Sequence, residues 1–291
     1  MNQSPLLFSP DLSREEYQHL TPARAGWEFL HFAARHMLPG RRWEFDTGEH
    51  ELALVVLGGV CSVYSNRGRW PRIGRRPDVF HGMPYCLYLP RRTRFTLEAL
   101  EQGVEIAYAW CPASEDHPVH LVTPAEVEIE IRGGGNATRQ INRMLPPGFD
   151  CQRLVAVEVF TPSGNWSSYP PHKHDIHQVD AEGRLLEADL EEVYFYQIDR
   201  PEGYAYQRVY SADGRLDELI LVRHHQLVLV PYGYHPVVAA HGYNTYYLNF
   251  LAGSAQSLAS SDDPQYAWVK STWTEKDPRL PLVSMAMEAT P

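Results

Sequence analysis

The chain has 291 residues, a length that suits two small domains or one large one. Hydrophobic residues make up 44% of it and charged residues 21%, which are proportions of a globular protein and exclude a disordered or fibrous chain. The 26 Lys and Arg residues are outnumbered by 36 Asp and Glu residues, and the resulting net charge of −10 argues against a nucleic-acid-binding protein.

The sequence predicts a cytoplasmic protein that does not enter a membrane. No apolar run approaches the roughly 18–20 residues of a membrane span, and the N-terminus lacks a basic start followed by an apolar secretory segment. The cysteines are far apart and form no CxxC pair, so we expect buried free thiols rather than disulfides or a thiolate zinc site. They are Cys61, Cys86, Cys111 and Cys151.

Short runs of β-branched and aromatic residues, separated by turn residues, predict an all-β protein. Residues 27–37 fit either a helix or a strand, and residues 52–60 fit a strand that is buried on both faces and ends near Gly58-Gly59. Residues 127–131 alternate with acidic neighbours, which is typical of a strand with one acidic face. The other predicted strands are residues 94–100, 105–111, 154–160, 192–198, 219–222, 227–230 and 246–251.

The two halves of the chain show a weak internal sequence similarity. Around Pro90 and around Pro231, about 140 residues later, a strand enters a proline-containing turn and a second strand follows. This similarity predicts two copies of one β-fold that join within the turn-rich segment 132–148. We therefore expect an N-terminal domain of residues 1–140 and a C-terminal domain of residues 141–291.

Two histidines stand at positions i and i+2, directly after a pair of prolines. On a strand, His172 and His174 leave from the same face, so both imidazoles can reach one point. The alternative is a pair of surface histidines in a polar loop. By the same alternation, Lys173 points away from them.

An aromatic strand that begins with two carboxylates follows this histidine pair. Period-two alternation places Glu192, Tyr194 and Tyr196 on one face, and Glu191 on the other. Burying a carboxylate in so apolar a strand is costly without a cation or donors. The face that carries Glu192 is the one we expect to line a cavity, with Glu191 as the alternative ligand.

A third segment places His235 at a turn between two apolar strands. Together with His172, His174 and Glu192, it forms a set of three histidines and one carboxylate. This set suits a borderline divalent ion such as zinc, iron(II), manganese or nickel, with open positions for water or substrate.

This order of ligands resembles that of cupins, which are small β-barrels with an ion inside. The segments PPHKHD, EEVYFYQ and LVPYGYHPVVAAHGYNTYYLNFLAG together resemble the 5-deoxyglucuronate isomerase family of myo-inositol catabolism. A relative of that family, 5-dehydro-4-deoxy-D-glucuronate isomerase, acts in pectin breakdown. The resemblance covers most of the chain and is strongest over residues 154–254.

The resemblance implies an all-β bicupin, with the metal site of His172, His174, Glu192 and His235 in the C-terminal barrel. The glutamate lies much farther from the second histidine than in most cupins, so residues 175–190 must form an inserted hairpin or loop. The first barrel has no His-x-His and carries two arginines where the second has its turn histidine. We expect it to bind no metal and to be structural or part of an interface.

The activity that the resemblance implies is metal-dependent conversion of 5-deoxy-D-glucuronate into 5-dehydro-2-deoxy-D-gluconate by a homo-oligomer. Tyr194, Tyr196 and Tyr232 are candidate proton carriers or hydroxyl donors. Asn249 is a candidate substrate contact or, alternatively, a satisfied core amide. The sequence identifies neither the general base nor the cation for the substrate carboxylate, for which Arg153, Arg208 and Arg223 are equal candidates.

Three other functions fit the same residues less well. The chain could act on the deoxyuronate of pectin breakdown, with similar chemistry. A redox-active iron at the same site would make it a cupin oxygenase, which consumes O₂. A non-catalytic sugar-binding or storage bicupin would have no reason to retain four inward metal-ligating groups.

Overall fold

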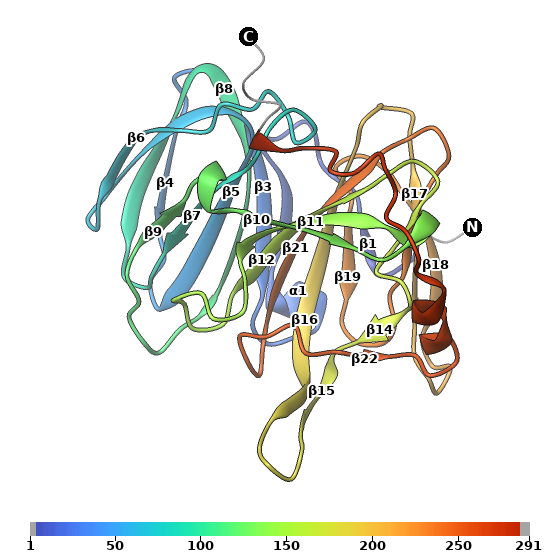
Figure 1. The fold of residues 1–291 in the computed structure, drawn as a ribbon. Coiled ribbons are helices and arrows are strands. Elements are labelled where there is room, and N and C mark those ends of the chain that lie inside the picture. Colours follow the sequence, from blue (N-terminus) through green and yellow to red (C-terminus); the bar gives the residue numbers. More distant parts are fainter. Residues whose placement is uncertain (1–3, 286–291) are drawn as a thin grey trace. The chain divides into compact units, whose positions relative to one another are not determined.

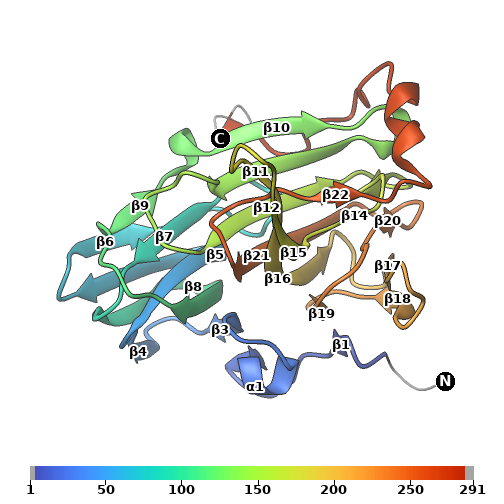
Figure 2. The same ribbon diagram turned by 90° about the horizontal axis from the view of Figure 1, so that it is seen from below.

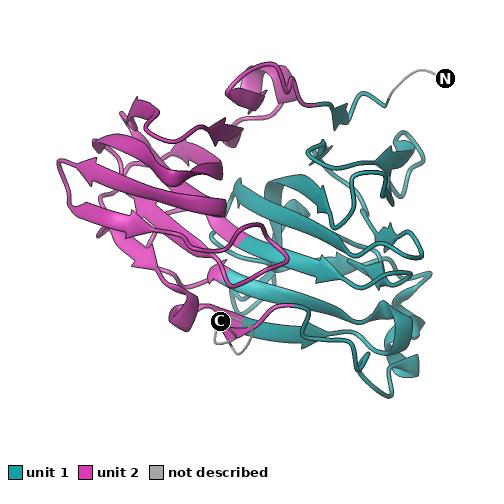
Figure 3. Ribbon diagram, turned by 90° about the horizontal axis from the view of Figure 1, so that it is seen from above, with its two compact units in different colours: residues 1–9, 129–143, 157–282 teal, residues 10–128, 144–156, 283–291 magenta. Residues whose placement is uncertain are grey.

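The computed structural model describes residues 4–285, and the chain forms two compact units (Figure 3). Unit 1 comprises residues 1–9, 129–143 and 157–282, and unit 2 comprises residues 10–128, 144–156 and 283–291. Each unit is therefore assembled from three separate stretches of sequence.

Unit 2 is built on one antiparallel sheet of eight strands (Figure 1). The strands are β2 (Glu16–Leu20), β3 (His31–Met37), β4 (Arg42–Asp46), β5 (His50–Ser65), β6 (Arg69–Ile73), β7 (Tyr85–Leu89), β8 (Arg94–Pro112) and β9 (His120–Val122). Their order is β2-β3-β8-β5-β7-β9, with β4 also paired to β8 and β6 to β5. One α-helical turn, α1 (Pro22–Ala25), and one 3-10 turn, η1 (Pro124–Glu126), complete the unit.

The long strands β5 and β8 differ from their predicted bounds for one reason. The prediction ends the first near Gly58-Gly59 and divides the second in two, but β5 and β8 pair along nearly their whole length. Their register shifts at Gly58 and Gly59, where a bulge bends both strands without ending them. Gly59 has a φ of +80°, and a Cβ there would lie 2.2 Å from the Gly103 carbonyl oxygen, so only glycine fits.

Aromatic rings fill the interior of unit 2. The ring of Trp43 lies 4.6 Å from that of Tyr108 and 5.3 Å from that of Phe95, measured between centroids. The Tyr108 and Trp110 rings are stacked 5.4 Å apart. Such packing contributes beyond simple burial of apolar area, so this interior is stabilised by ring contacts.

The remaining strands form unit 1, apart from the ends of β10, β11 and β12 that belong to unit 2. They are β1 (Leu7–Phe8), β10 (Glu128–Arg132), β11 (Arg139–Leu145), β12 (Val155–Thr161), β13 (Trp166–Ser167), β14 (His172–Lys173), β15 (Asp175–Val179), β16 (Leu185–Ile198), β17 (Ala205–Tyr210), β18 (Asp217–Val222), β19 (Leu227–Val230), β20 (Val237–Ala239), β21 (Thr245–Gly253) and β22 (Ser261–Asp262). Two 3-10 helices, η2 (Gly135–Ala137) and η3 (Ala267–Thr272), lie between them.

Three sheets make up this unit (Figure 2). An eight-stranded sheet has the order β1-β19-β16-β21-β12-β11-β10, with β15 paired to β16; a second has the order β13-β20-β17-β18, and β14 pairs with β22. Side chains from the two larger sheets meet in the interior, where the Tyr196 hydroxyl donates to Gln207 Oε1 at 2.8 Å. Ser167 of β13 and Tyr247 of β21 make a second such contact.

Several expectations from the sequence are confirmed. The chain is all-β, with helices of six residues or fewer among the described residues. The predicted insertion is the hairpin of β15 and β16, which projects from unit 1 (Figure 1). All four cysteines are buried, and no disulfide joins them.

Within residues 4–285, no helix is long and apolar enough to cross a membrane.

A buried carboxylate holds the chain in place where it returns to unit 2. Glu51 accepts backbone N–H bonds from Gln152, Arg153 and Leu154 at 2.8, 2.7 and 2.9 Å. It also accepts the Tyr88 hydroxyl at 2.9 Å. With the Cys111 thiol, five donors satisfy this carboxylate, so its burial is tolerated.

We expect Glu51→Ala to lower the free energy of unfolding by about 3–5 kcal/mol, because it leaves several buried donors without an acceptor. Urea unfolding followed by tryptophan fluorescence measures the change. Glu49→Ala is the matched control, since the Glu49 side chain is 61% exposed and should leave unfolding nearly unchanged. Equal midpoints for the two variants would contradict the role of Glu51.

Candidate metal centre

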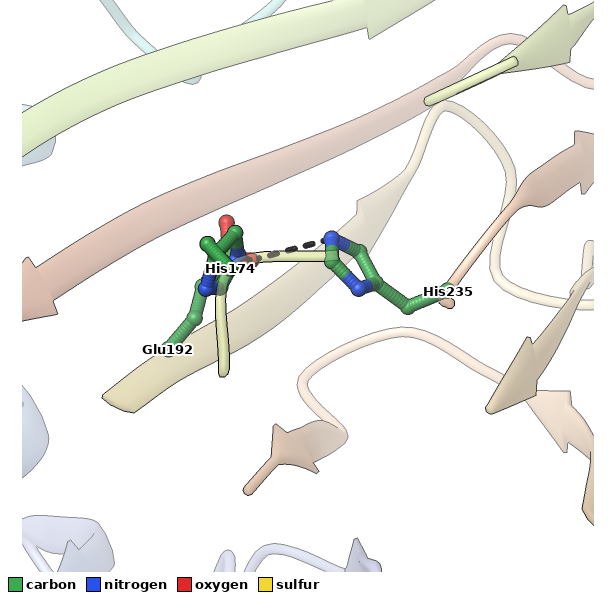
Figure 4. Close-up of side chains that lie close together, drawn as sticks. All are labelled: His174, Glu192 and His235. Atoms are coloured by element: carbon green, nitrogen blue, oxygen red, sulfur yellow. Dashed lines mark hydrogen bonds and ion pairs between the residues drawn. The ribbon is translucent and has the colours of Figure 1, made fainter. Parts of the chain in front are cut away.

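Three side chains from separate segments meet in the interior of unit 1 (Figure 4). His174 lies between β14 and β15, Glu192 lies in β16, and His235 lies in the turn after β19. All three are buried, and one ligand atom of each lies within 4.8 Å of the others. Glu192 Oε2 is 2.9 Å from His174 Nε2 and 3.3 Å from His235 Nε2, so both histidines direct the same nitrogen at one carboxylate oxygen.

Backbone carbonyls orient the two imidazole rings. His174 Nδ1 lies 3.1 Å from the Leu190 carbonyl oxygen, and His235 Nδ1 lies 2.9 Å from that of Gly233. A ring nitrogen that faces a carbonyl must carry a proton, so Nε2 is the nitrogen that each ring can offer to an ion.

A divalent ion fits this donor set. Buried polar atoms rarely lack a partner, yet His235 Nε2 has no hydrogen-bond partner among the described residues. Donor atoms that share an ion at about 2.1 Å lie about 3 Å apart. The separations of 2.9 and 3.3 Å around Glu192 Oε2 are close to that value. The triad could therefore hold an ion that accepts nitrogen and oxygen ligands.

His172, the fourth residue of the predicted ligand set, lies beside this triad. Its ring centroid is 4.8 Å from that of His235 and 6.5 Å from that of His174. It is half-buried and lines the same cavity as His174 and Glu192. The structure thus brings all four predicted residues to one place, with three of them in closest contact.

Burial and neighbouring charges determine how these histidines are protonated. Burial, with two other histidines nearby, lowers the pKa of His172 well below its ordinary value, and burial lowers the pKa of His235 to about 4. Burial also opposes a charge on His174, but the hydrogen bond and charge of Glu192 outweigh it and raise its pKa. A bound ion would displace the proton that His174 and Glu192 share.

An aspartate links the histidine-pair segment to the turn that carries His235. Asp175 Oδ2 accepts the Gly233 N–H at 3.0 Å, and the same carboxylate pairs with Lys173. Lys173 also pairs with Glu187 at 2.7 Å. These contacts hold Lys173 away from the triad, as strand alternation predicts.

A small cavity of about 140 Å³ opens beside the triad. It is lined by His172, His174 and Glu192 together with three cationic side chains, Arg132, Arg139 and Lys270, and the rings of Tyr169 and Trp273. A larger cavity of about 670 Å³ lies in unit 2, but the described residues cluster metal-ligating atoms only in unit 1. The chemistry of the lining, rather than cavity size, identifies the site.

Hydroxyl groups adjoin the triad. The Tyr194 ring centroid is 5.8 Å from that of His235, and its hydroxyl lies 3.1 Å from Ser168 Oγ. The Tyr247 hydroxyl lies 3.3 Å from the same Ser168 oxygen and also bonds to Ser167. Burial raises the pKa of Tyr194 well above its ordinary value, so this hydroxyl stays protonated and can donate.

The other predicted side chains lie elsewhere. The Tyr196 hydroxyl is bound to Gln207, Tyr232 is 42% exposed, and the Asn249 amide donates to the Val193 carbonyl at 3.1 Å. Asn249 and the three candidate tyrosines, Tyr194 included, are not among the described residues that line the cavity.

The three candidate arginines are also away from this cavity. Arg153 lies in unit 2, where its guanidinium is 4.7 Å from the Phe29 ring centroid. Arg208 forms two hydrogen bonds with Asp217, at 2.7 and 2.8 Å. Arg223 is exposed, in the turn after β18.

No spacing pattern in the sequence identifies Arg139, Ser168 or Tyr247 as neighbours of the site. Arg139 begins β11 and Ser168 follows β13, and only the pairing of distant strands brings them near the triad. The one available signal is alternation along residues 246–251, because it places Tyr247 on the same face as Asn249.

The turn before His235 requires glycine. Gly233 has a φ of +88°, and a Cβ there would lie 2.5 Å from the Tyr210 carbonyl oxygen. Gly214 has a φ of +70° with nothing within 4 Å of its Cβ position, and so offers a matched comparison.

We expect Gly214→Ala to lower the free energy of unfolding by about 1–2 kcal/mol through backbone strain alone. Gly233→Ala adds a clash that displaces the His235 turn, so it should destabilise more and weaken binding of a divalent ion about 10–100-fold. Urea unfolding and ion titration measure both effects. Identical ion affinities in the two variants would contradict the role of this turn.

Comparison with known proteins shows the family of this chain. The model of the KduI/IolB family matches residues 7–269. A 5-deoxy-glucuronate isomerase of Geobacillus thermodenitrificans is 41% identical over 86% of this chain and 89% of its own length, and one of Listeria monocytogenes is 34% identical over 87% and 91%.

Solved structures give the same result. An IolB-like protein of Salmonella typhimurium superposes with a TM-score of 0.86 at 35% identity and covers 91% of this chain and 98% of its own. A mutant of Bacillus subtilis oxalate decarboxylase superposes with a TM-score of 0.62 over 90% of this chain and 80% of its own; at 14% identity this likeness concerns the fold alone and confirms the predicted all-β, cupin-like class. The chain belongs to the KduI/IolB family.

Proposed function

We propose that this protein is a metal-dependent aldose–ketose isomerase that converts 5-deoxy-D-glucuronate into 5-dehydro-2-deoxy-D-gluconate in myo-inositol catabolism. The observation that carries this proposal is the 41% identity, over 86% of the chain, to a 5-deoxy-glucuronate isomerase. The buried triad and its cationic cavity support it, because an anionic sugar needs both a polarising group and positive charge.

The ligand set that we propose is His172, His174, Glu192 and His235, with zinc, manganese or iron as the ion. The contacts of Glu192 with two histidines favour it over Glu191, which strand alternation turns to the opposite face. When bound, such an ion supplies a Lewis acid for negative charge that develops on the oxygens of C1 and C2 during isomerisation.

The chain itself supplies positioning and proton donors. The carbonyls of Leu190 and Gly233 orient two of the histidines. The Tyr194 ring lies 5.8 Å from that of His235 and carries a protonated hydroxyl. We propose that this hydroxyl donates a hydrogen bond to a substrate oxygen, where charge develops. Its raised pKa makes it a poor base.

We further propose that the N-terminal domain, which we place at residues 1–140, is a structural barrel that binds no metal, and that the four metal ligands belong to the domain of residues 141–291. The last residues of the first domain, which include Arg132 and Arg139, line the cavity beside these ligands. The aromatic interior of unit 2 supports a structural role. Free buried cysteines favour a reducing compartment, so we propose the cytoplasm. Exposed apolar side chains such as Leu219 and Trp268 support association into a homo-oligomer.

The decisive experiment is an anaerobic assay with 5-deoxyglucuronate in D₂O, in which NMR follows ketose formation before and after chelation. We expect conversion that stops on chelation and resumes when a divalent ion is restored. His174→Ala should lower activity by at least about 10²-fold, because it removes one member of the triad. His177→Ala is the matched control, since His177 is exposed and contacts Ser254.

No conversion by the wild-type protein with its ion bound would reject this substrate. The next assays would then use the pectin-derived deoxyuronate and, after that, O₂ uptake. An unaffected rate in His174→Ala would reject the metal site while leaving the substrate assignment intact.

Phenylalanine substitutions separate the three candidate tyrosines. Tyr194→Phe should lower kcat about 10²-fold, since it removes a donor to developing charge. Tyr196→Phe should have a smaller effect, because its hydroxyl is bound to Gln207, and the exposed Tyr232 should matter least. Steady-state kinetics at saturating substrate measure kcat, and a larger loss in Tyr232→Phe would contradict this order.

A further inference from the structure

A buried arginine shares the cavity of the triad. Arg139, the first residue of β11, is only 5% exposed and lines the same cavity as His172, His174 and Glu192. Burying a guanidinium is costly unless hydrogen bonds and a negative partner compensate it. The contacts of Arg139 therefore indicate what it is for.

The other two cations in the cavity already have carboxylate partners. Arg132 binds Glu130 through two nitrogens, at 2.7 and 2.9 Å, and Lys270 pairs with Asp262. Glu130 is shared with Arg143, and these carboxylates already occupy donors of Arg132 and Lys270, so a cation without an ion pair is the readier receptor for a further anion.

Arg139 differs from both. Within the described residues, no carboxylate forms an ion pair with Arg139. Its Nη1 donates a hydrogen bond to the Tyr169 carbonyl oxygen at 3.3 Å. A guanidinium carries five N–H donors in a planar fork that matches a carboxylate, so most of its donor capacity is left for a ligand.

We propose that Arg139 binds the carboxylate of the sugar acid and thereby selects deoxyuronates over neutral sugars. This inference rests on the proposed function and deepens it, because the substrate carries an aldehyde at one end and a carboxylate at the other. With the triad at the reacting end and Arg139 at the acid end, the cavity holds an open-chain sugar acid in one orientation. Arg139 is a specificity-determining residue, remote from the atoms that exchange hydrogen.

The test compares the acid with 5-deoxy-D-glucose, in which a hydroxymethyl group replaces the carboxylate. Wild-type protein should prefer the acid by at least about 10²-fold in kcat/KM. The neutral sugar would leave the buried Arg139 guanidinium without an anionic partner, and this disfavours its binding. Arg139→Gln should lower kcat/KM for the acid about 10²-fold and leave that for the neutral sugar within about threefold. Arg139→Lys should recover part of the loss, because it restores the charge without the fork.

Two controls separate binding from a structural role. Arg208→Gln removes an arginine that is held by Asp217 outside this cavity and should leave the preference for the acid unchanged. The ion affinity of Arg139→Gln should equal that of the wild type. Equal losses of kcat/KM for both sugars, or a lower affinity for the ion, would mean that Arg139 merely supports the Tyr169 segment. Either result would overturn the proposal.

A binding measurement separates this inference from the proposed reaction. Calorimetry with the acid whose aldehyde is reduced to an alcohol requires no turnover. Binding to the wild type that Arg139→Gln weakens about 10²-fold supports the role of Arg139 even if the isomerase assay fails. Absence of binding to the wild type, or loss of binding in Arg132→Gln instead, would overturn it.

Discussion

Strand β16 is hydrogen-bonded on both sides, and its register with β19 and β21 determines which side chains enter the interior of unit 1. Glu192 lies opposite Val230 on one side and Leu251 on the other. A slip of one residue would turn Glu192 and Tyr194 outward, because successive side chains of a strand point to opposite faces. Val230 is also the last residue of β19, so the same register determines where the turn toward His235 begins.

Two buried glutamates illustrate how environment assigns a role to one residue type. In unit 2, Glu51 receives five hydrogen bonds from neutral donors and needs nothing further. In unit 1, Glu192 faces two imidazole nitrogens, one of which lacks any hydrogen-bond partner among the described residues. The first arrangement is complete and stabilises the fold, whereas the second could hold a cation.

The cationic cavity extends the same argument from fold to substrate. Glu192 would be shared with an ion. Arg132 and Lys270 each pair with a carboxylate, whereas Arg139 forms no ion pair within the described chain. Arg139 is therefore the cation of this cavity whose donors are most available to an anionic ligand. Charge arranged in this way recognises an anion by geometry, and it leaves the reacting end of the ligand to the triad.

Local sequence patterns predicted much of this protein. The histidine pair, the aromatic strand that begins with Glu192 and the turn histidine each act through alternation or turn chemistry within a few residues, and such constraints can be read from the chain. The inserted hairpin followed from the spacing between His174 and Glu192, which is longer than in the cupin pattern that the chain resembles, and the structure contains it. Between Glu191 and Glu192, alternation favoured the residue that contacts both histidines.

Other features depended on long-range pairing. Residues 27–37 fit helix and strand equally well by pattern, and the pairing of β3 with β8 makes 31–37 a strand. The continuity of β5 and β8 through Gly59 also required the partner strand, because the bulge exists only between the two. Arg139 is one of many arginines in the sequence. What distinguishes it is that carboxylates pair with the other two cations of the cavity, but none pairs with Arg139 among the described residues. The sequence by itself determined which face of each strand bears the side chains of the candidate site. Which strands are neighbours, and so which charge remains unpaired, was decided by the tertiary structure, because the sheets join segments that are far apart in the chain.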